Sequence, residues 1–191
     1  MRVFVAIDLP DLVRDEVEVL QHALSAGRLL PPENFHLTLS FLGEQPDEAL
    51  EDAHEALSSM RLPAFDLQLA GVGAFGKRSP NLIFADVLRC DPLSDLEQRI
   101  IRKLRNAGLD FQKQRFRPHV TIARLPKALS AFELARVREY LADHAAFRSS
   151  CFRVGSFVMY QSTLMPGSAR HEVLARYELL DAQDNVPGFS T

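Results

Sequence analysis

The sequence has little of what marks secreted, membrane-spanning or multidomain proteins. Its two cysteines, Cys90 and Cys151, fit neither a disulfide framework nor a zinc knuckle, so we expect reduced core residues. No apolar stretch approaches membrane-spanning length, and residues 1–9 form a short strand-like run without a charged leader or cleavage site. No Gly/Ser-rich linker divides the chain. These absences predict a cytoplasmic protein with one domain.

The composition is that of a globular chain with an uneven charge. Hydrophobic residues make up 47% of the 191 residues, enough for one domain of two lobes. The net charge of −3 argues against general adhesion to nucleic acid. Residues 99–127 nevertheless contain one acid, Asp110, and nine bases: Arg99, Arg102, Lys103, Arg105, Lys113, Arg115, Arg117, Arg124 and Lys127. Such a run is usually a solvated face, but its position around the motif described next makes it a candidate phosphate-binding surface.

A short pattern, His-x-Thr-x within an apolar run, occurs twice. The first copy lies in NFHLTLSFL and the second in RFRPHVTIAR. Because alternate side chains of a strand share a face, His36 lies beside Thr38, and His119 lies beside Thr121. A polar pair on a core-forming strand costs desolvation unless its face is wet or matched by other polar groups. Two such strands therefore predict a shared polar cleft.

Apolar spacing predicts strands and helices in alternation. Besides the motif strands, we expect strands at Val3–Ile7, Phe65–Leu69, Leu82–Val87, Phe152–Tyr160 and Glu172–Leu179. Helices are expected to begin at Pro10, at Pro46, at a cap formed by Asp91 and Pro92, and at a capping box of Ser130 and Glu133. The last helix is expected to turn Leu134, Val137 and Leu141 inward. A glycine-rich turn through Gly71, Gly73 and Gly76 should end the first half.

The two halves repeat one order of elements: strand, helix, motif strand, helix, strand. A duplicated α+β unit with pseudo-twofold symmetry would bring the motif strands together at its axis. We therefore expect one two-lobed domain, whose lobes exchange strands, and a frayed C-terminal tail. The expected boundaries are residues 1–180 for the domain, about 1–76 and 80–162 for the pseudo-repeats, and 181–191 for the tail.

The paired motifs, with RPHVTIAR around the second, resemble the signatures of the two-histidine (2H) phosphoesterases. Within that superfamily the chain is most similar to the RNA 2′,3′-cyclic phosphodiesterases, formerly called 2′-5′ RNA ligases. The likeness spans nearly the whole chain, through MRVFVAIDLP, HLTLSFLGE, FDLQLAGVGAF, RFRPHVTIAR, YQSTL and YELL. It implies a duplicated α+β fold with antiparallel sheets, flanking helices and a central cleft. One departure is the absence of tryptophan, which relatives often carry before the first motif or in the strand at Leu82–Val87.

The chemistry of a cyclic phosphodiester suits this pair of motifs. Opening the ring requires a base that deprotonates water and an acid that protonates the departing sugar oxygen. Two histidines suit both tasks, because a pKa of about 6.5 allows one to be neutral and the other charged. The hydroxyls of Thr38 and Thr121 can donate to the non-bridging oxygens, so no metal or other cofactor is needed. The resemblance implies that His36 is the proton donor and His119 the acceptor, an order that the residues alone leave open.

Four further residues are candidates for substrate binding. Arg124 can clamp phosphate through its guanidinium, although five residues after His119 it faces away unless the strand ends or bulges first. Phe41, Phe75 and Tyr160 are candidates for stacking on a nucleobase, at positions that more often belong to the core. The remaining histidines lack a partner motif and are expected at the surface; they are His22, His54, His144 and His171.

Three classes of function stay open on the residues. The resemblance implies hydrolysis of a terminal 2′,3′-cyclic phosphate on RNA to a 2′-phosphate, with RNA ends or cyclic nucleotides as substrates and no protein partner. An RNA-end binding module or a 2′-5′ RNA ligase would keep the same pocket, although intact histidines and threonines disfavour an inactive site. A histidine metal site would require a third ligand at compatible spacing, and the sequence offers none.

Overall fold

The computed structural model describes residues 1–76, 79–112, 115–165 and 168–181. In chain order the strands are β1 (Arg2–Asp8), β2 (Arg28–Leu29), β3 (His36–Glu44), β4 (Phe65–Leu67), β5 (Leu69–Phe75), β6 (Leu82–Val87), β7 (His119–Arg124), β8 (Phe152–Val154), β9 (Ser156–Met165) and β10 (Ser168–Glu178). The helices are α1 (Asp11–His22), α2 (Asp47–Ser58), α3 (Asp91–Asn106) and α4 (Ala131–Asp143), with a short 3₁₀ helix, η1 (Pro32–Asn34). The chain is therefore of the α+β class.

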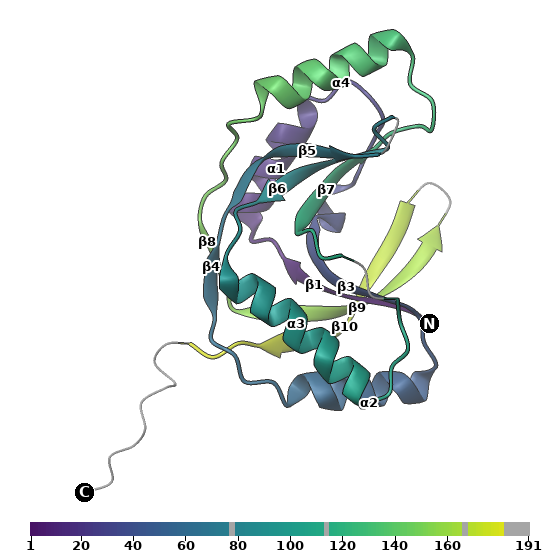
Figure 1. Cartoon of the computed structure of the whole chain (residues 1–191), viewed down its shortest axis with the longest axis vertical. Helices are drawn as coiled ribbons and strands as arrows, with labels where there is room; N and C mark the ends of the chain where they lie inside the picture. Colours follow the sequence, from purple (N-terminus) through teal and green to yellow (C-terminus); the bar gives the residue numbers. More distant parts are fainter. Residues whose placement is uncertain (77–78, 113–114, 166–167, 182–191) are drawn as a thin grey trace, which may run out of the picture.

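Most strands join one antiparallel sheet with the order β10-β9-β1-β3-β7-β6-β5, in which β2 also pairs with β7. A single residue pair, Leu37 with Val120, is the described link between β3 and β7. The sheet thus divides into two lobes at the two motif strands, as Figure 1 shows. Strands β4 and β8 form a separate two-stranded ribbon.

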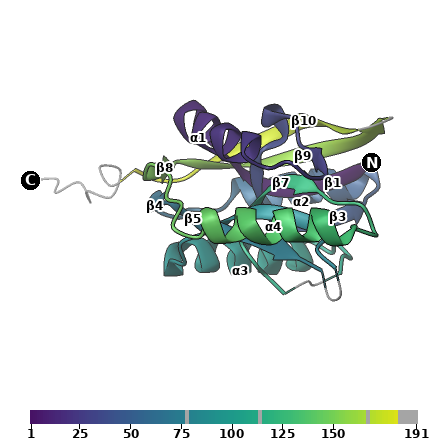
Figure 2. The same ribbon diagram turned by 90° about the horizontal axis from the view of Figure 1, so that it is seen from above.

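Helices α1 and α3 each pack on the lobe opposite to the strand that precedes them. Helix α1 follows β1 in the chain but packs on β7 of the other lobe, whereas α3 follows β6 and packs against β3 and α2. Figure 1 shows α1 and α4 beside β5, β6 and β7, and α2 and α3 beside the other lobe. From above, α1 and α3 lie at opposite edges of the molecule with strands between them (Figure 2). The motif strands therefore sit where the two lobes meet.

Helix faces follow the predicted apolar spacing. Helix α1 buries Val13, Val17 and Leu20, and α3 buries its apolar residues at similar intervals. The capping box that begins α4 is confirmed, since the amide of Glu133 donates to Ser130 Oγ over 3.2 Å and the amide of Ser130 donates to Glu133 Oε2 over 2.8 Å. Sequence spacing thus located these helices within about one turn.

Three local predictions were wrong in whole or in part. Asp91 does not cap α3, because it is the first helical residue and Cys90 occupies the cap without a side-chain hydrogen bond. The prediction of two core cysteines is wrong for Cys151, which is exposed, whereas Cys90 is half-buried and packs against the core. In α4 the predicted inward face is confirmed for Val137, which is buried, and for Leu141, which is half-buried against the core, while Leu134 is half-buried and Tyr140 is buried as well. Tyr140 can be buried because its hydroxyl donates to the carbonyl of Leu20 over 3.1 Å.

The expected glycine-rich turn is largely a strand. Gly71 and Gly73 lie within β5, which pairs with β6 and has a register shift between Leu69 and Val72. Gly71 has a φ of +85°, which a residue with a side chain rarely adopts. The strands expected over Phe65–Leu69 and Phe152–Tyr160 are each divided, because their first parts form the β4–β8 ribbon and their later parts join the main sheet.

No helix in the described part of the chain is long and apolar enough to cross a bilayer. Two of the predicted features lie outside the described residues: Lys113 of the basic run, and residues 182–191 of the tail.

Candidate active site

The two motif histidines begin neighbouring strands. His36 is the first residue of β3 and His119 the first of β7, and the link between these strands is the pair Leu37 and Val120. The two motif strands run in opposite directions on either side of this link. Thr38 of the first motif and His119 of the second therefore line the same cavity. The duplication therefore places residues of both copies in one place.

His119 is held in one orientation by its own strand and by aromatic rings. Its Nδ1 lies 2.7 Å from the carbonyl oxygen of Arg117, and its ring packs edge-on against Phe75 with 4.9 Å between centroids. Phe84 packs on it at 5.3 Å. Burial lowers the pKa of His119, while the Arg117 carbonyl and the Asp86 carboxylate oppose that shift. A neutral imidazole is thus favoured in the unliganded site.

His36 has a parallel environment. Its ring packs on Phe4 with 4.8 Å between centroids. The pKa of His36 is lowered to about 4, chiefly by burial and then by the charge of the nearby His171, whereas a hydrogen bond to the backbone of Asn34 and the charge of Asp8 oppose the shift. The charge of His119 also lowers this pKa, which places the two motif rings within electrostatic range of each other.

His36 and His119 occupy equivalent positions in two pairs of strands. Asp8 pairs with His36 across β1 and β3, and Asp86 pairs with His119 across β6 and β7. Paired residues of antiparallel strands point to the same face, so each histidine has one carboxylate beside it. The aromatic supports correspond in the same way, since Phe4 comes from β1 and Phe84 from β6.

Gly73 makes room for the ring under His119. A Cβ atom at Gly73 would lie 2.4 Å from the ring of Phe84, closer than any real contact. The glycine of β5 therefore lets Phe84 lie flat across the strand, where it also packs on Phe75 at 4.4 Å.

Asp8 is fixed by two partners. It accepts a hydrogen bond from the hydroxyl of Tyr160 and forms an ion pair with Arg176 over 2.6 Å. The ring of Tyr160 stacks on Phe4 at 5.2 Å. Burial and the neighbouring carboxylate of Asp8 raise the pKa of Tyr160, so its hydroxyl stays protonated and continues to donate.

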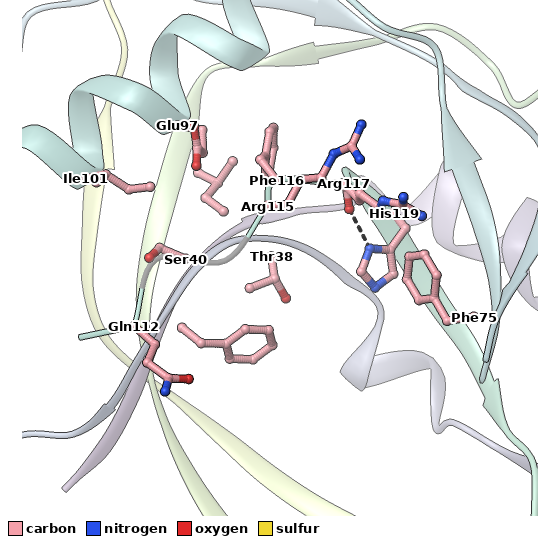
Figure 3. A pocket seen from close by; sticks show the side chains of 12 residues that line it. Thr38, Ser40, Phe75, Glu97, Ile101, Gln112, Arg115, Phe116, Arg117 and His119 are labelled. Atoms are coloured by element: carbon pink, nitrogen blue, oxygen red, sulfur yellow. Dashed lines mark hydrogen bonds between the residues drawn. The ribbon is translucent and has the colours of Figure 1, made fainter. Parts of the chain in front are cut away.

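A cavity of about 170 Å³ lies beside His119 (Figure 3). Thr38, Phe41 and Phe75, all singled out from the sequence, line it together with the basic and aromatic residues that precede the second motif. Phe41 is 51% exposed, so its ring is accessible. Arg115 and Arg117, two members of the predicted basic run, also line it. The sequence analysis did not single out four other lining residues, Ser40, Glu97, Gln112 and Phe116.

The remaining predicted site residues, His36 among them, are not in the wall of this cavity. Thr121 is half-buried on β7 opposite Phe84. Tyr160 lies 6.3 Å from the ring of His36, between ring centroids. Arg124, the last residue of β7, lines a different cavity that it shares with His171. The end of the strand thus separates Arg124 from His119.

The expectation that the other four histidines lie at the surface was wrong for two of them. His22 and His54 are exposed, but His144 is half-buried and stacks on Tyr140. His171 is also half-buried and packs edge-on against His36 at 5.3 Å. Its position on β10, distant in sequence from both motifs, left no local signal for this contact.

The described residues contain no group of three or more His, Cys, Asp and Glu side chains arranged to hold a metal ion.

Comparisons with known proteins identify the family of the chain. The model of the 2′-5′ RNA ligase superfamily matches residues 9–164. The chain belongs to the 2′-5′ RNA ligase superfamily. An RNA 2′,3′-cyclic phosphodiesterase of Archaeoglobus fulgidus is 30% identical over 93% of this chain and all of that protein. The prediction of a two-histidine phosphoesterase is thereby confirmed.

Solved structures share the fold of this chain. TT0787 of Thermus thermophilus superposes with a TM-score of 0.75 and 27% identity, over 93% of this chain and 97% of that one. Escherichia coli LigT, crystallised with 3′-AMP, superposes with a TM-score of 0.72 and 26% identity, over 93% and 96% of the two chains. The predicted two-lobed α+β fold is confirmed by these matches.

Proposed function

We propose that the chain is an RNA 2′,3′-cyclic phosphodiesterase that opens a terminal cyclic phosphate to a 2′-phosphomonoester. The observation that carries the proposal is the meeting of both His-x-Thr strands at the centre of one sheet, with Thr38 and His119 in one cavity. Two relatives support it: the Archaeoglobus fulgidus protein bears this name, and Escherichia coli LigT was crystallised with a nucleotide.

In the proposed reaction, His119 accepts a proton from water as the water oxygen attacks phosphorus. The bond between phosphorus and the ribose 3′ oxygen breaks, and His36 donates its proton to that oxygen. One water molecule is consumed, and the product carries a 2′-phosphate and a 3′-hydroxyl. His119 then loses its proton to solvent, and His36 gains a new proton when the next substrate binds. The order of donor and acceptor follows the family resemblance.

The tautomer of His119 suits a proton acceptor. Its Nδ1–H donates to the carbonyl of Arg117 over 2.7 Å, which leaves the lone pair on Nε2. Burial keeps the ring neutral because it lowers the pKa. Both properties are those that a general base requires before it takes a proton from water.

The proposed donor, His36, must gain a proton when substrate binds. In the unliganded site its pKa of about 4 leaves it neutral near pH 7. An anionic phosphate raises the pKa of a neighbouring imidazole, and Asp8 already acts in the same direction. We propose that Tyr160 serves this step by holding Asp8, because its ring is already stacked on Phe4 and its hydroxyl is engaged.

The remaining side chains provide binding and charge stabilisation. Thr38 and Thr121 donate hydrogen bonds to the non-bridging phosphate oxygens. Phe41 and Phe75 offer ring faces to a nucleobase, and Phe41 is the more accessible of the two. Acid, base and hydrogen-bond donors together leave no step that requires a metal ion.

The test is to incubate purified protein with an oligonucleotide that ends in a 2′,3′-cyclic phosphate and, separately, with a 2′-5′-linked or 3′-5′-linked diester. We expect the cyclic end to become a 2′-phosphate while the linear diesters persist. A variant with both His36→Gln and His119→Gln is the control. Joined products in place of a 2′-phosphate would favour ligation by the reverse reaction. Tight binding without any product would favour a module that only binds RNA ends.

A further inference from the structure

Asn34 is a buried polar residue just before the first motif. It is the last residue of η1, and only 8% of it is exposed. An unpaired amide at such a position would cost desolvation free energy, so its partner matters. The Nδ2 of Asn34 donates a hydrogen bond to the carbonyl of Ala169 over 3.0 Å. One side chain therefore joins η1 to strand β10, 135 residues later in the chain.

The backbone of Asn34 holds the ring of His36. Its carbonyl accepts a hydrogen bond from the imidazole, which is why this contact raises the pKa of His36. The second motif has the same relation, since His119 Nδ1 lies 2.7 Å from the carbonyl of Arg117, also two residues earlier. Arg117 is exposed, whereas Asn34 is buried and bonded to β10. The first motif is thus anchored to a distant strand through the residue that orients its histidine.

The strand that Asn34 holds brings a second imidazole to His36. His171 lies two residues beyond Ala169, a spacing that puts both residues on one face of β10. The ring of His171 packs edge-on against His36 at 5.3 Å and against Phe4 at 4.9 Å between centroids. The hydrogen bond at Ala169 therefore keeps His171 against His36. Without it, β10 could move away and let water reach the His36 ring.

The groups around His36 determine how readily it gives up a proton. The titratable residues that face it are Asp8 of β1, His119 of β7, Tyr160 of β9 and His171 of β10. Arg176 of β10 pairs with Asp8 over 2.6 Å. Burial and the charge of His171 are the two largest causes of the low pKa of His36, and β10 contributes to both. A donor with a low pKa is a strong acid once the substrate has charged it, which suits the proposed role of His36.

We propose that Asn34 is a positioning residue for His36, which it orients through its carbonyl and covers with β10 through its side-chain amide. The inference rests on the proposed function, in which His36 is the proton donor. Asn34 acts through His36 and His171 rather than on the substrate. Substitution of its side chain leaves the backbone carbonyl in place, so a variant tests the tie to β10 by itself.

The test combines an NMR titration with the pH dependence of turnover. In Asn34→Ala the pKa of His36 should rise from about 4 toward about 6.5, while the titration of His119 stays as in the parent. The limb of the kcat profile at high pH should move to higher pH, because the donor must be protonated. We expect kcat at pH 7 to fall about tenfold and KM to change less than about twofold, since Asn34 does not touch the substrate.

Matched variants separate positioning from a general loss of structure. Asn106→Ala, at an exposed position of α3, should titrate and turn over like the parent. Asn34→Ser, which keeps a hydroxyl in the buried site, is the second variant if Asn34→Ala melts too low for the titration.

An unchanged His36 titration in a folded Asn34 variant would overturn the inference. A fall in turnover with unmoved pH limbs would also overturn it, because a purely structural defect gives that result. The titration of His36 needs no substrate. If the parent fails to open cyclic phosphates while Asn34→Ala still shifts the His36 titration, the proposed function alone is overturned.

Discussion

His171 meets His36 edge to face, with 5.3 Å between the ring centroids and 86° between the ring planes. The two residues lie on β10 and β3, at opposite ends of the chain, and the sheet brings them together through β9 and β1. A positive charge on both imidazoles at this separation would cost electrostatic free energy. His171 is accordingly, after burial, the largest cause of the low pKa of His36.

This contact predicts how the pKa of His36 responds to a substitution. His171→Phe keeps a ring against His36 but removes the second titratable group, so the pKa of His36 should rise from about 4 toward the ordinary value. Titration of the imidazole carbon-bound protons by NMR measures it. His22→Phe, at an exposed position of α1, should leave the His36 titration unchanged. An unmoved His36 pKa in the His171 variant would show that His171 has no electrostatic role there.

The folded chain should become less stable as the pH is lowered, because it holds His36 neutral. The pKa of His36 is about 4 in the folded chain and about 6.5 when unfolded, so the unfolded state binds more protons between these values. Stability from this residue is therefore present above about pH 6.5 and is lost as the pH falls toward 4. The loss is on the order of 2–3 kcal/mol. Urea unfolding of the parent and of His36→Gln at pH 7 and pH 4.5 measures it.

The comparison of the two proteins isolates His36 from other acid-sensitive groups. His36→Gln should lose less stability between the two pH values than the parent does. His22→Gln, whose residue is exposed, should lose as much as the parent. Equal losses in the parent and the His36 variant would mean that the folded chain does not hold His36 neutral.

Removal of either motif histidine should abolish most of the activity. His36→Ala and His119→Ala should each lower turnover about 10²-fold or more, the usual contribution of a positioned acid or base. Thr38→Val and Thr121→Val should have smaller effects, because each removes one hydrogen bond to phosphate. Initial rates on a cyclic-phosphate oligonucleotide give these values, with melting curves to verify folding. Near-normal turnover in a folded histidine variant would rule out the paired roles.

Activity should survive chelation. The proposed acid, base and hydrogen-bond donors are all side chains of the chain itself, so prolonged treatment with EDTA should leave turnover within about twofold. Rates before and after treatment, and after addition of zinc or manganese, provide the measurement. Loss on chelation and recovery with metal would replace the two-histidine mechanism with a metal-assisted one.

The sequence predicted the motif strands because their evidence is local. His36 and Thr38 sit at strand spacing within a run of apolar residues, and so do His119 and Thr121. Helix starts at Pro10 and Ser130 were also readable, since proline and a capping box act within one turn. These features depend on neighbours in sequence, which a sequence displays directly.

The parts that escaped prediction depend on neighbours in space. The contact of His171 with His36 depends on the strand order β10-β9-β1-β3. The hydrogen bond from Tyr160 to Asp8 depends likewise on the pairing of β9 with β1. Gly71 and Gly73 suggested a turn. In the structure Gly71 lies at a register shift of β5, and the missing side chain of Gly73 leaves room for the ring of Phe84. Glycine suits a turn and an irregular strand equally well. The pairing of β5 with β6 determines that a strand forms here.

The central position of β1 has a consequence for how the chain folds during synthesis. Its residues pair with β3 on one side and with β9 on the other, and that second partner is made only after Ser156. Strand β1 is thus synthesised well before β9, the partner that completes its pairing. Pairing over so great a separation makes folding slow and leaves an apolar strand edge open in the nascent chain. Production of this protein should therefore depend on chaperones more than its modest length suggests.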